Sequence, residues 1–214
     1  MPPAKTRDAE RSRAQILQSA ERVFAHEGYD AASLAMIGDA AGVSRATPSY
    51  FFGSKQELYQ AVLRAMYRDR TATLQPAFAP VAAWAESEAP AETLRTVLGR
   101  AVASYLSFLS HRPTYVDIIE REALARGQRL NGLQVESTVM EDAFAALRRH
   151  ARRHGLGSFD VGEAVICLVA LGYTPVAHRH TLLRRHGFVH DDPRFLARRR
   201  RHIVDLLLHM MVAP

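Results

Sequence analysis

The stretch of sequence that decides the fold reads Ser33-Leu34-Ala35-Met36-Ile37-Gly38-Asp39-Ala40-Ala41-Gly42-Val43-Ser44-Arg45-Ala46-Thr47-Pro48-Ser49-Tyr50-Phe51-Phe52. It predicts two short helices, at about 33–40 and 44–51. Ser33 and Ser44 each precede one of them, and a serine oxygen in that position can accept a hydrogen bond from the unpaired N–H groups of the first turn. The pattern predicts a helix-turn-helix, a unit whose second helix typically enters the major groove of DNA.

The turn between these helices has its own signature. Gly42 supplies the left-handed backbone that a tight turn between crossing helices needs. Gly38 lacks a side chain where the two helices must approach closely, and Ile37 and Val43 are apolar anchors for the pair. Similar turns join short helices in many helical proteins, so the turn residues alone leave DNA binding open.

Upstream, the sequence predicts one helix from Ala9 to His26. Ile16, Ala20, Val23 and Phe24 recur at helical spacing and form one apolar face. Gly28 is placed to end this helix. The residues before it, through about Glu10, are interpreted as a polar, mobile arm.

Downstream, the chain reads as helical throughout, because Ala, Leu, Arg and Glu dominate and alternating β-branched runs are missing. A longer helix begins at Ser54, and Pro76, Pro80 and residues 86–90 predict loops or kinks. Five more helical segments are expected, at about 91–110, 113–126, 130–154, 160–185 with a break near Pro175, and 194–212. The predicted fold class is all-α.

Net charge permits nucleic-acid binding without locating it. The formal net charge of the 214 residues is +6. Residues 1–55 carry seven Lys or Arg against six Asp or Glu, whereas residues 145–214 carry twelve against five. Most of the excess therefore lies far from the helix-turn-helix. The four arginines at 198–201 point around a helix and are interpreted mainly as a solvated surface.

The region from Arg13 to Leu58 resembles the N-terminal domain of TetR-type regulators. The resemblance rests on residue type and spacing at Ile16-Leu17, Ala20, Phe24, Gly28-Tyr29, Ser33-Leu34, Ile37, Ala40-Ala41-Gly42-Val43-Ser44, Thr47, Phe52-Gly53-Ser54-Lys55 and Glu57-Leu58. It implies an N-terminal three-helix DNA-binding domain at 10–70 and a helical effector-binding and dimerisation domain at 71–214. It further implies a dimeric regulator, usually a repressor, that a small molecule releases from its operator.

Carried over by position, the resemblance implies that α-helical residues after the turn face the major groove and that two flanking residues touch phosphate. Arg45 is the expected base contact, to guanine. Ser33 and Lys55 are the expected phosphate contacts. The complete predicted DNA-binding set is Ser33, Ser44, Arg45, Ala46, Thr47, Ser49, Tyr50, Phe51 and Lys55.

Two positions depart from the family pattern. Pro48 stands where an aliphatic residue is usual, and with Ser44 as cap it forfeits only the first backbone bond of its helix. Ser49 stands where a phosphate-contacting tyrosine is usual, with Tyr50 next to it. Either Ser49 makes a shorter contact or Tyr50 replaces it.

The C-terminal part resembles the family only weakly, at 112–124 and 172–178. A pocket is expected among apolar and aromatic side chains with a few polar groups, although core packing is the alternative for each. The predicted ligand-binding residues are Tyr105, Phe108, Leu109, Ile118, Ile119, Glu122, Met140, Phe144, Leu168 and Tyr173. The predicted dimer residues, whose alternative is burial within one subunit, are Val165, Leu168, Val169, Gly172, Ile203, Leu206, Leu207 and Met210.

Other chemistries find little support. His178 and His180 lie on different helix faces, so no metal site is predicted, and no cofactor-binding or catalytic motif is present. Cys167, the only cysteine, is expected to be inert core and fits a reducing cytoplasm. No signal or membrane-spanning stretch is expected. The predicted partners are double-stranded operator DNA, a small-molecule effector and a second copy of the chain.

The predicted function is a ligand-responsive transcriptional regulator, most simply a repressor, and not an enzyme. Two alternatives stay open at this point. One is a DNA-binding regulator without a small-molecule effector. The other is a helical ligand-binding protein whose DNA-binding head is degenerate, an alternative raised by Pro48 and Ser49.

Overall fold

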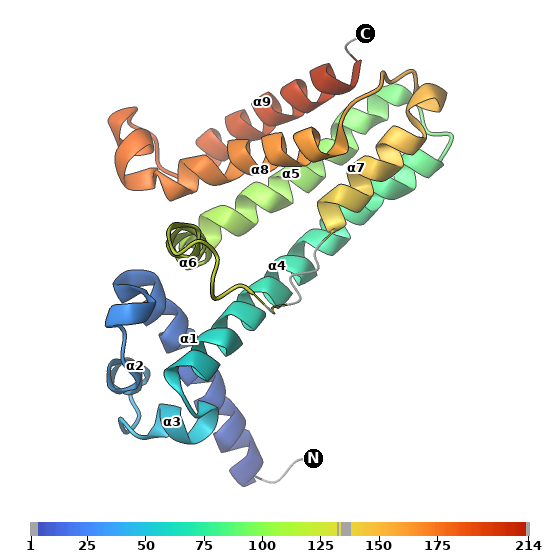
Figure 1. The fold of residues 1–214 in the computed structure, drawn as a ribbon. Helices are drawn as coiled ribbons and strands as arrows, with labels where there is room; N and C mark the ends of the chain where they lie inside the picture. The colour runs from blue at the N-terminus through green and yellow to red at the C-terminus, as the bar shows by residue number, and fades with distance from the viewer. Residues whose placement is uncertain (1–3, 132, 134–137, 213–214) are drawn as a thin grey trace. The chain divides into compact units, whose positions relative to one another are not determined.

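A computed structural model describes residues 4–131, 133 and 138–212, and within them every regular element is a helix (Figure 1). The all-α prediction is confirmed. The elements, in chain order, are α1 (Ala4–Ala31), α2 (Leu34–Ala41), α3 (Thr47–Phe52), α4 (Lys55–Glu86), η1 (Ala91–Thr93), α5 (Leu94–His111), α6 (Pro113–Leu124), α7 (Val139–Arg149), η2 (Ala151–His154), α8 (Val161–Ala177), η3 (Arg179–Leu183) and α9 (Pro193–Val212).

The chain divides into two compact units. Unit 1 comprises Met1–Arg68 and Thr114–Val135, and unit 2 comprises Asp69–Pro113 and Glu136–Pro214. α4 contributes residues to both. The domain boundary predicted between residues 70 and 71 stays a prediction.

Helix α1 is longer than predicted. The helix begins at Ala4, so the predicted mobile arm is wrong over residues 4–10. Residues 1–3 of the predicted arm lie outside the described part of the chain. No glycine or proline interrupts 4–27, which explains the early start. The predicted apolar face is buried at Ile16, Ala20 and Phe24. Gly28 breaks the helix as expected, with φ 83° and ψ 169°.

The turn chemistry of α2 is confirmed. The Ser33 Oγ accepts a hydrogen bond from the Met36 N–H at 3.2 Å. Gly42 takes the left-handed conformation, with φ 67° and ψ 29°. A Cβ on Gly38 would lie 3.0 Å from the Arg45 Cα and 3.0 Å from the Ser44 carbonyl oxygen. Gly38 is therefore a close-approach position, as the sequence predicted.

The start of α3 differs from the prediction. Ser44 does not cap it: the helix begins at Thr47, its N-cap is Ala46, and that end has no side-chain cap. Pro48 is the reason, because a proline lacks the N–H of a helix interior but fits the first turn. The Ser44 hydroxyl instead pairs with the Thr47 hydroxyl at 2.7 Å.

Helix α4 opens with a capping box. The Ser54 N–H donates to the Glu57 carboxylate at 2.8 Å, and the Glu57 N–H donates to the Ser54 Oγ at 3.1 Å. The helix then runs through Pro76 and Pro80, so a loop at these prolines is wrong, whereas the loop predicted at 86–90 follows the helix end at Glu86. Both prolines are exposed. The opposite face is held by the buried side chains of Leu74, Phe78 and Val81.

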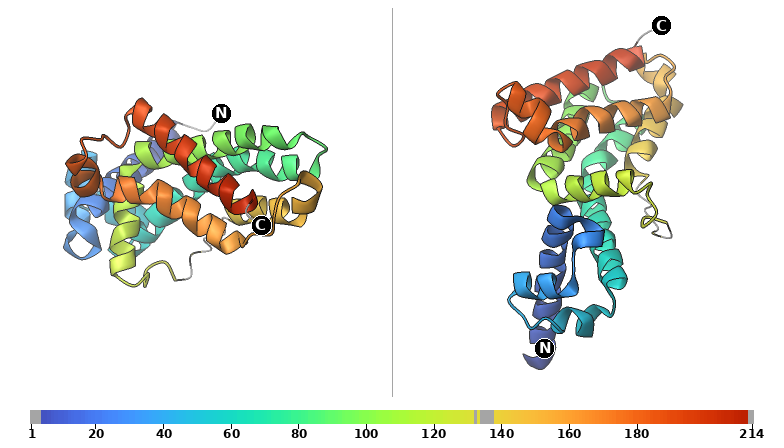
Figure 2. Two further views of the ribbon diagram at one scale, coloured as in Figure 1. Left: turned by 90° about the horizontal axis from the view of Figure 1, so that it is seen from above. Right: turned by 60° about the vertical axis from the view of Figure 1, so that its left-hand side comes forward.

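Unit 2 is built on α5, α8 and α9, which pack against one another, with α7 against α8. Figures 1 and 2 show α8 and α9 side by side in every view. The predicted helix at 130–154 is too long, because α7 begins only at Val139. Pro175 does not break α8, which continues to Ala177 and is followed by the π-helical turn η3. No described helix is both long and apolar enough to cross a bilayer.

Candidate functional site

Helix α3 has one buried and one exposed side. Pro48 and Phe52, four residues apart, are buried and fix the helix to unit 1. The Arg13 guanidinium lies 4.7 Å from the Phe52 ring centroid. On the other side, the Tyr50 side chain stands edge-on to Phe51 and Tyr50 is 84% exposed. Tyr50 is therefore available for contact with a partner.

Arg45, in the turn before α3, is exposed and paired with Asp39. Its Nε donates to Asp39 Oδ1 at 3.1 Å, and its Nη2 lies 3.1 Å from Asp39 Oδ2. The hydrogen bond and the charge of Asp39 raise the pKa of Arg45. To contact DNA, the Arg45 guanidinium must therefore either keep Asp39 as a second partner or release it. The sequence did not predict this pair, because six residues separate Arg45 from Asp39.

The predicted hydroxyl contacts differ in their local bonding. The Ser33 hydroxyl accepts from Met36 and keeps its own proton for another acceptor. The Ser49 hydroxyl donates to the Gly53 carbonyl at 3.0 Å, which ties it to its own helix. Ser44 and Ala46 are exposed, whereas Thr47 and Phe51 are half-buried.

Lys55 is used inside unit 1. Its Nζ donates to the carbonyl oxygens of Tyr29, Asp30 and Ala32 at 2.9, 3.2 and 3.0 Å. An ammonium has three N–H donors, so all are engaged. The same Nζ lies 4.6 Å from the Tyr29 ring centroid. Lys55 therefore closes the end of α1 in this structure, and its phosphate contact stays a prediction.

Helix α6 is bonded to α1 within unit 1. The Arg121 guanidinium donates to the carbonyl oxygens of Ala25 and His26 at 3.0 and 2.6 Å. A Cβ on Gly28 would lie 2.9 Å from Arg121 Nη1, so Gly28 also makes room for this contact. Thr114, near the start of α6, donates to the Glu21 carboxylate at 2.5 Å.

A buried carboxylate adds a second link. Glu122 is 1% exposed, and its Oε1 accepts from the Tyr59 hydroxyl at 2.7 Å. Burial and this bond raise the pKa of Tyr59, which keeps its hydroxyl protonated. Arg129 Nη1 lies 3.6 Å from the same oxygen. The second oxygen, Oε2, has no hydrogen-bond partner among the described residues. α6 is thereby joined to both α1 and α4 of unit 1.

The predicted ligand-binding residues fall in both units. Ile118, Ile119 and Glu122 lie on α6 in unit 1, where Ile118 is fully buried. The others lie in unit 2, where Tyr173 is half-buried and the rest are buried: Tyr105, Phe108, Leu109, Met140, Phe144 and Leu168. Of the complete predicted set, Phe108 lines the cavity described next.

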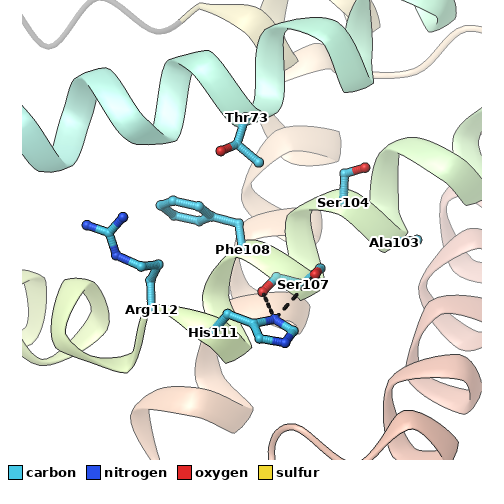
Figure 3. Close-up of a pocket in the computed structure, with 7 residues that line it drawn as sticks. All are labelled: Thr73, Ala103, Ser104, Ser107, Phe108, His111 and Arg112. Carbon is cyan, nitrogen blue, oxygen red and sulfur yellow. Dashed lines mark hydrogen bonds between the residues drawn. The ribbon is translucent and has the colours of Figure 1, made fainter.

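A cavity of about 520 Å³ lies within unit 2 on the side of α5 that faces α4 (Figure 3). Figure 3 shows the Phe108 ring between Thr73 and Arg112. Arg112 Nη1 donates to Asp69 Oδ2 at 2.8 Å, and His111 Nδ1 lies 2.8 Å from the Ser107 carbonyl oxygen. The lining residues are Thr73, Ala103, Ser104, Ser107, Phe108, His111 and Arg112. The hollow is open to solvent and combines one aromatic ring with hydroxyl, imidazole and guanidinium groups.

The predicted dimer residues separate by exposure. Leu168, Ile203 and Leu207 are 0% exposed within the single chain, and Gly172 is buried. Val165, Val169, Leu206 and Met210 keep exposed surface. Ile166, at 60% exposure, joins them and was missed by the sequence analysis. These side chains form an exposed apolar surface on α8 and α9 within the single chain.

Histidine and cysteine residues form no recognisable site in the described ranges. No group of three or more His, Cys, Asp or Glu there is arranged to hold a metal ion. Cys167 is a free thiol and is half-buried, so it is less enclosed than predicted. The His154 ring packs on the Trp84 ring, with 4.2 Å between centroids, and its Nε2–H donates to the Ala85 carbonyl oxygen at 2.9 Å.

The capped α2, the left-handed turn at Gly42 and the exposed face of α3 define a helix-turn-helix DNA-binding regulator. Residues 16–62 match the family model described as "Bacterial regulatory proteins, tetR family". This N-terminal part of the chain is therefore similar to the DNA-binding domain of the TetR family. The relatives that the chain matches are named transcriptional regulators.

Individual relatives agree with this assignment. The chain is 27% identical over 183 residues to the HTH-type transcriptional repressor NicS of Pseudomonas putida, covering 83% of this chain and 82% of the relative. It is 48% identical over 52 residues to the HTH-type transcriptional activator FasR of Mycolicibacterium smegmatis, covering 24% of each. Among solved structures, a TetR-family regulator from Marinobacter aquaeolei matches with a TM-score of 0.64 and 17% identity, over 94% of this chain and 97% of that one. That structural likeness shows the fold.

Proposed function

We propose that the protein is a cytoplasmic, homodimeric repressor that binds operator DNA through α3 and responds to a small molecule. The observation that carries the proposal is the exposed surface at α3, where Tyr50 on the helix and Arg45 in the preceding turn are exposed while Pro48 and Phe52 are buried. Anchoring matters because a base contact adds specificity only when the side chain is held in register with the groove.

Within this surface, Arg45 is the proposed base contact and Tyr50 the proposed backbone or thymine contact. Arginine is suited to guanine because two N–H groups can donate to O6 and N7. The hydroxyl of Ser33, which retains its proton, is the proposed phosphate contact. Asp39 is proposed to hold Arg45 in the free protein and to compete with DNA for it.

Dimerisation is proposed through the outer faces of α8 and α9. Ile166, at 60% exposure, and Leu206, at 39%, are large apolar side chains that a second copy would cover. A two-fold dimer presents two α3 helices to successive major grooves, which predicts a pseudo-palindromic operator.

The cavity in unit 2 is the proposed effector site. Arg112 lines it and is followed directly by Pro113, the first residue of α6. α6 in turn is bonded to α1 by Arg121 and to α4 by Glu122. A ligand that moved Arg112 away from Asp69 would therefore act on α6 through the chain itself, and its effect on DNA binding would equal its differential affinity for the two states.

The sign of regulation is proposed from the relative that aligns over most of the chain. NicS, aligned over 82% of its length, is named a repressor, whereas FasR, aligned over 24%, is named an activator. Repression is therefore the favoured sign.

A mobility-shift assay tests the proposal. The purified protein is titrated against DNA upstream of its own gene, with non-specific competitor. We expect a discrete competitor-resistant shift that Tyr50→Ala abolishes and Leu124→Ala preserves; Leu124, at 85% exposure, is a control for removing an exposed apolar side chain in unit 1. Weak, sequence-blind binding on this DNA and on DNA selected from random sequence would instead establish a degenerate head. If no compound in a small-molecule library releases the protein from this DNA, the proposal of a small-molecule effector is contradicted.

A further inference from the structure

A second concave surface of unit 2 is strongly cationic. A groove of about 380 Å³ lies between α5 and α9, with Arg95 and Arg100 on one side and Arg200 and Arg201 on the other. The two helices pack against each other within the same unit. The groove is therefore a fixed feature of that unit, and its volume lies in the range of small-molecule sites, about 300–1,000 Å³.

Three of these four arginines have no acidic partner in the described part of the chain. Arg95 is paired with Asp205. Arg100, Arg200 and Arg201 are exposed, and no ion pair holds any of them. Like charges that share a groove repel one another, so an anion bound between them gains more than it would on an isolated arginine.

The neighbouring arginines of the same run show what a structural role looks like. The Arg198 guanidinium lies 4.5 Å from the Phe188 ring centroid. Arg199 donates twice to the Leu171 carbonyl, at 2.9 and 2.7 Å. Among the described residues Arg200 and Arg201 make no such contact, and both line the groove. The run of four is thus divided into two packing residues and two residues that line a concave surface.

The floor of the groove contains a glycine that packing does not require. Gly99 lies inside α5, its φ is not left-handed, and a Cβ there would meet nothing within 4 Å. Glycine in a helix interior is less stable than alanine. Neither the backbone nor a close neighbour accounts for it, but its missing side chain deepens the groove beside the buried Val204.

We propose that this groove binds a small phosphate-bearing anion with at least two negative charges, such as an organic diphosphate. Guanidinium groups donate in pairs to phosphate oxygens, and several of them suit a multiply charged group better than a single carboxylate. Gly99 and Val204 provide an uncharged floor for the remainder of the ligand. The site is separate from the cavity lined by Phe108 and Arg112, and it does not depend on DNA binding.

Titration calorimetry with inorganic pyrophosphate, at constant ionic strength and on the full chain, tests the site. We expect one saturable binding event that Arg100→Gln/Arg200→Gln weakens by about 10-fold or more, since each charged hydrogen bond contributes that much. Arg184→Gln/Arg185→Gln is the matched control, because it removes two exposed arginines of unit 2 outside the groove. Equal weakening in both variants, or no saturable heat in the wild type, would overturn the proposal.

Gly99→Ala gives an independent test that a merely unstable variant cannot mimic. The added methyl group meets no neighbour, so the melting temperature should stay the same or rise, while pyrophosphate affinity falls. Unchanged affinity would contradict the role of the open floor. Citrate binding more tightly than pyrophosphate would overturn the choice of phosphate.

Two other occupants of the groove are also distinguishable. If Arg100→Gln/Arg200→Gln lowered the salt dependence of operator binding while pyrophosphate binding persisted, the groove would be a DNA contact. If the same variant changed the oligomeric state measured by light scattering, the groove would be a contact between copies. Either result would overturn the proposal.

Discussion

In unit 1 the cationic side chains around the helix-turn-helix are held by partners within the chain, whereas in unit 2 three arginines of the α5–α9 groove have no such partner among the described residues. Lys55 is bonded to three carbonyl oxygens, Arg45 to Asp39, and Arg121 to two carbonyl oxygens. The residues of the groove that stay unpaired are Arg100, Arg200 and Arg201. The net charge of a region therefore does not identify the surface that we propose for DNA binding.

The difference has a physical meaning. A cation already held in one geometry loses little side-chain entropy on binding, but it must exchange or share its partner. An unpaired cation attracts any nearby anion, and its mobile side chain distinguishes poorly between anions at different positions. The head is thus suited to reading a sequence, and the groove to binding a compact anion.

The largest effect is expected for Lys55→Met. Removing the ammonium leaves three backbone carbonyls at the end of α1 without their donor, so the free energy of unfolding should fall by about 2–4 kcal/mol. Urea denaturation measures this, with Gln56→Met as the exposed neighbouring control. Unchanged stability together with a lower salt slope of DNA binding would restore the phosphate contact predicted from the sequence.

Gly28→Ala should cost about 1–3 kcal/mol of stability, because φ 83° with ψ 169° is a conformation that alanine adopts only under strain. The added Cβ would also lie 2.9 Å from the Arg121 guanidinium. Gly187→Ala, at φ 70° with nothing near its Cβ, is the control and should cost less. If the two variants melt at the same temperature, the contact of α6 with α1 does not depend on Gly28.

Asp39→Asn and Arg45→Ala should move DNA affinity in opposite directions. Arg45→Ala should weaken operator binding by on the order of 10- to 100-fold and relax specificity at one base position. Asp39→Asn should strengthen binding a few-fold, because it removes the negative charge that competes with DNA for Arg45. Fluorescence anisotropy on matched operator variants measures both. Equal weakening on all sequences would make Arg45 a phosphate contact.

The smallest effect concerns the capping box of α4. Hydrogen bonds from Ser54 lower the pKa of the Glu57 carboxyl below its ordinary value of 4.5. Its contribution to stability is therefore present above that pH and is lost as pH falls through the lowered pKa. Glu57→Gln should lower the melting temperature slightly at pH 7, with the difference from wild type vanishing in acid. A constant difference down to pH 3 would contradict this, and Glu10→Gln is the exposed control.

Local chemistry explains why some features were predictable. The Ser33 cap, the Gly42 turn and the close approach at Gly38 each follow from neighbouring residues, and all three are confirmed. The start of α3 was misjudged because Pro48 moves it to Thr47. The prolines of α4 were misjudged because the buried face at Leu74 and Phe78 holds the helix together.

Contacts between residues distant in sequence were not predictable. Lys55 bonds to carbonyls 23 to 26 positions away, and backbone acceptors leave no mark on the sequence. Ser104, Ser107 and His111 form a polar stripe on α5 that is typical of a solvated helix face, so the cavity they line stayed hidden. The sequence also could not separate apolar residues of the core from apolar residues on the surface of α8. Leu168 is 0% exposed in the single chain, whereas Ile166 on the same helix is 60% exposed.

The most direct test compares one arginine from each region on the same DNA. Binding of the DNA upstream of the protein's own gene is measured across a salt series for wild type, Arg45→Ala and Arg200→Ala. Our account predicts that Arg45→Ala loses specific binding while Arg200→Ala keeps both the affinity and the salt slope of the wild type. Retained binding by Arg45→Ala, or an equal loss in Arg200→Ala, would contradict the assignment of DNA reading to the surface beside α3.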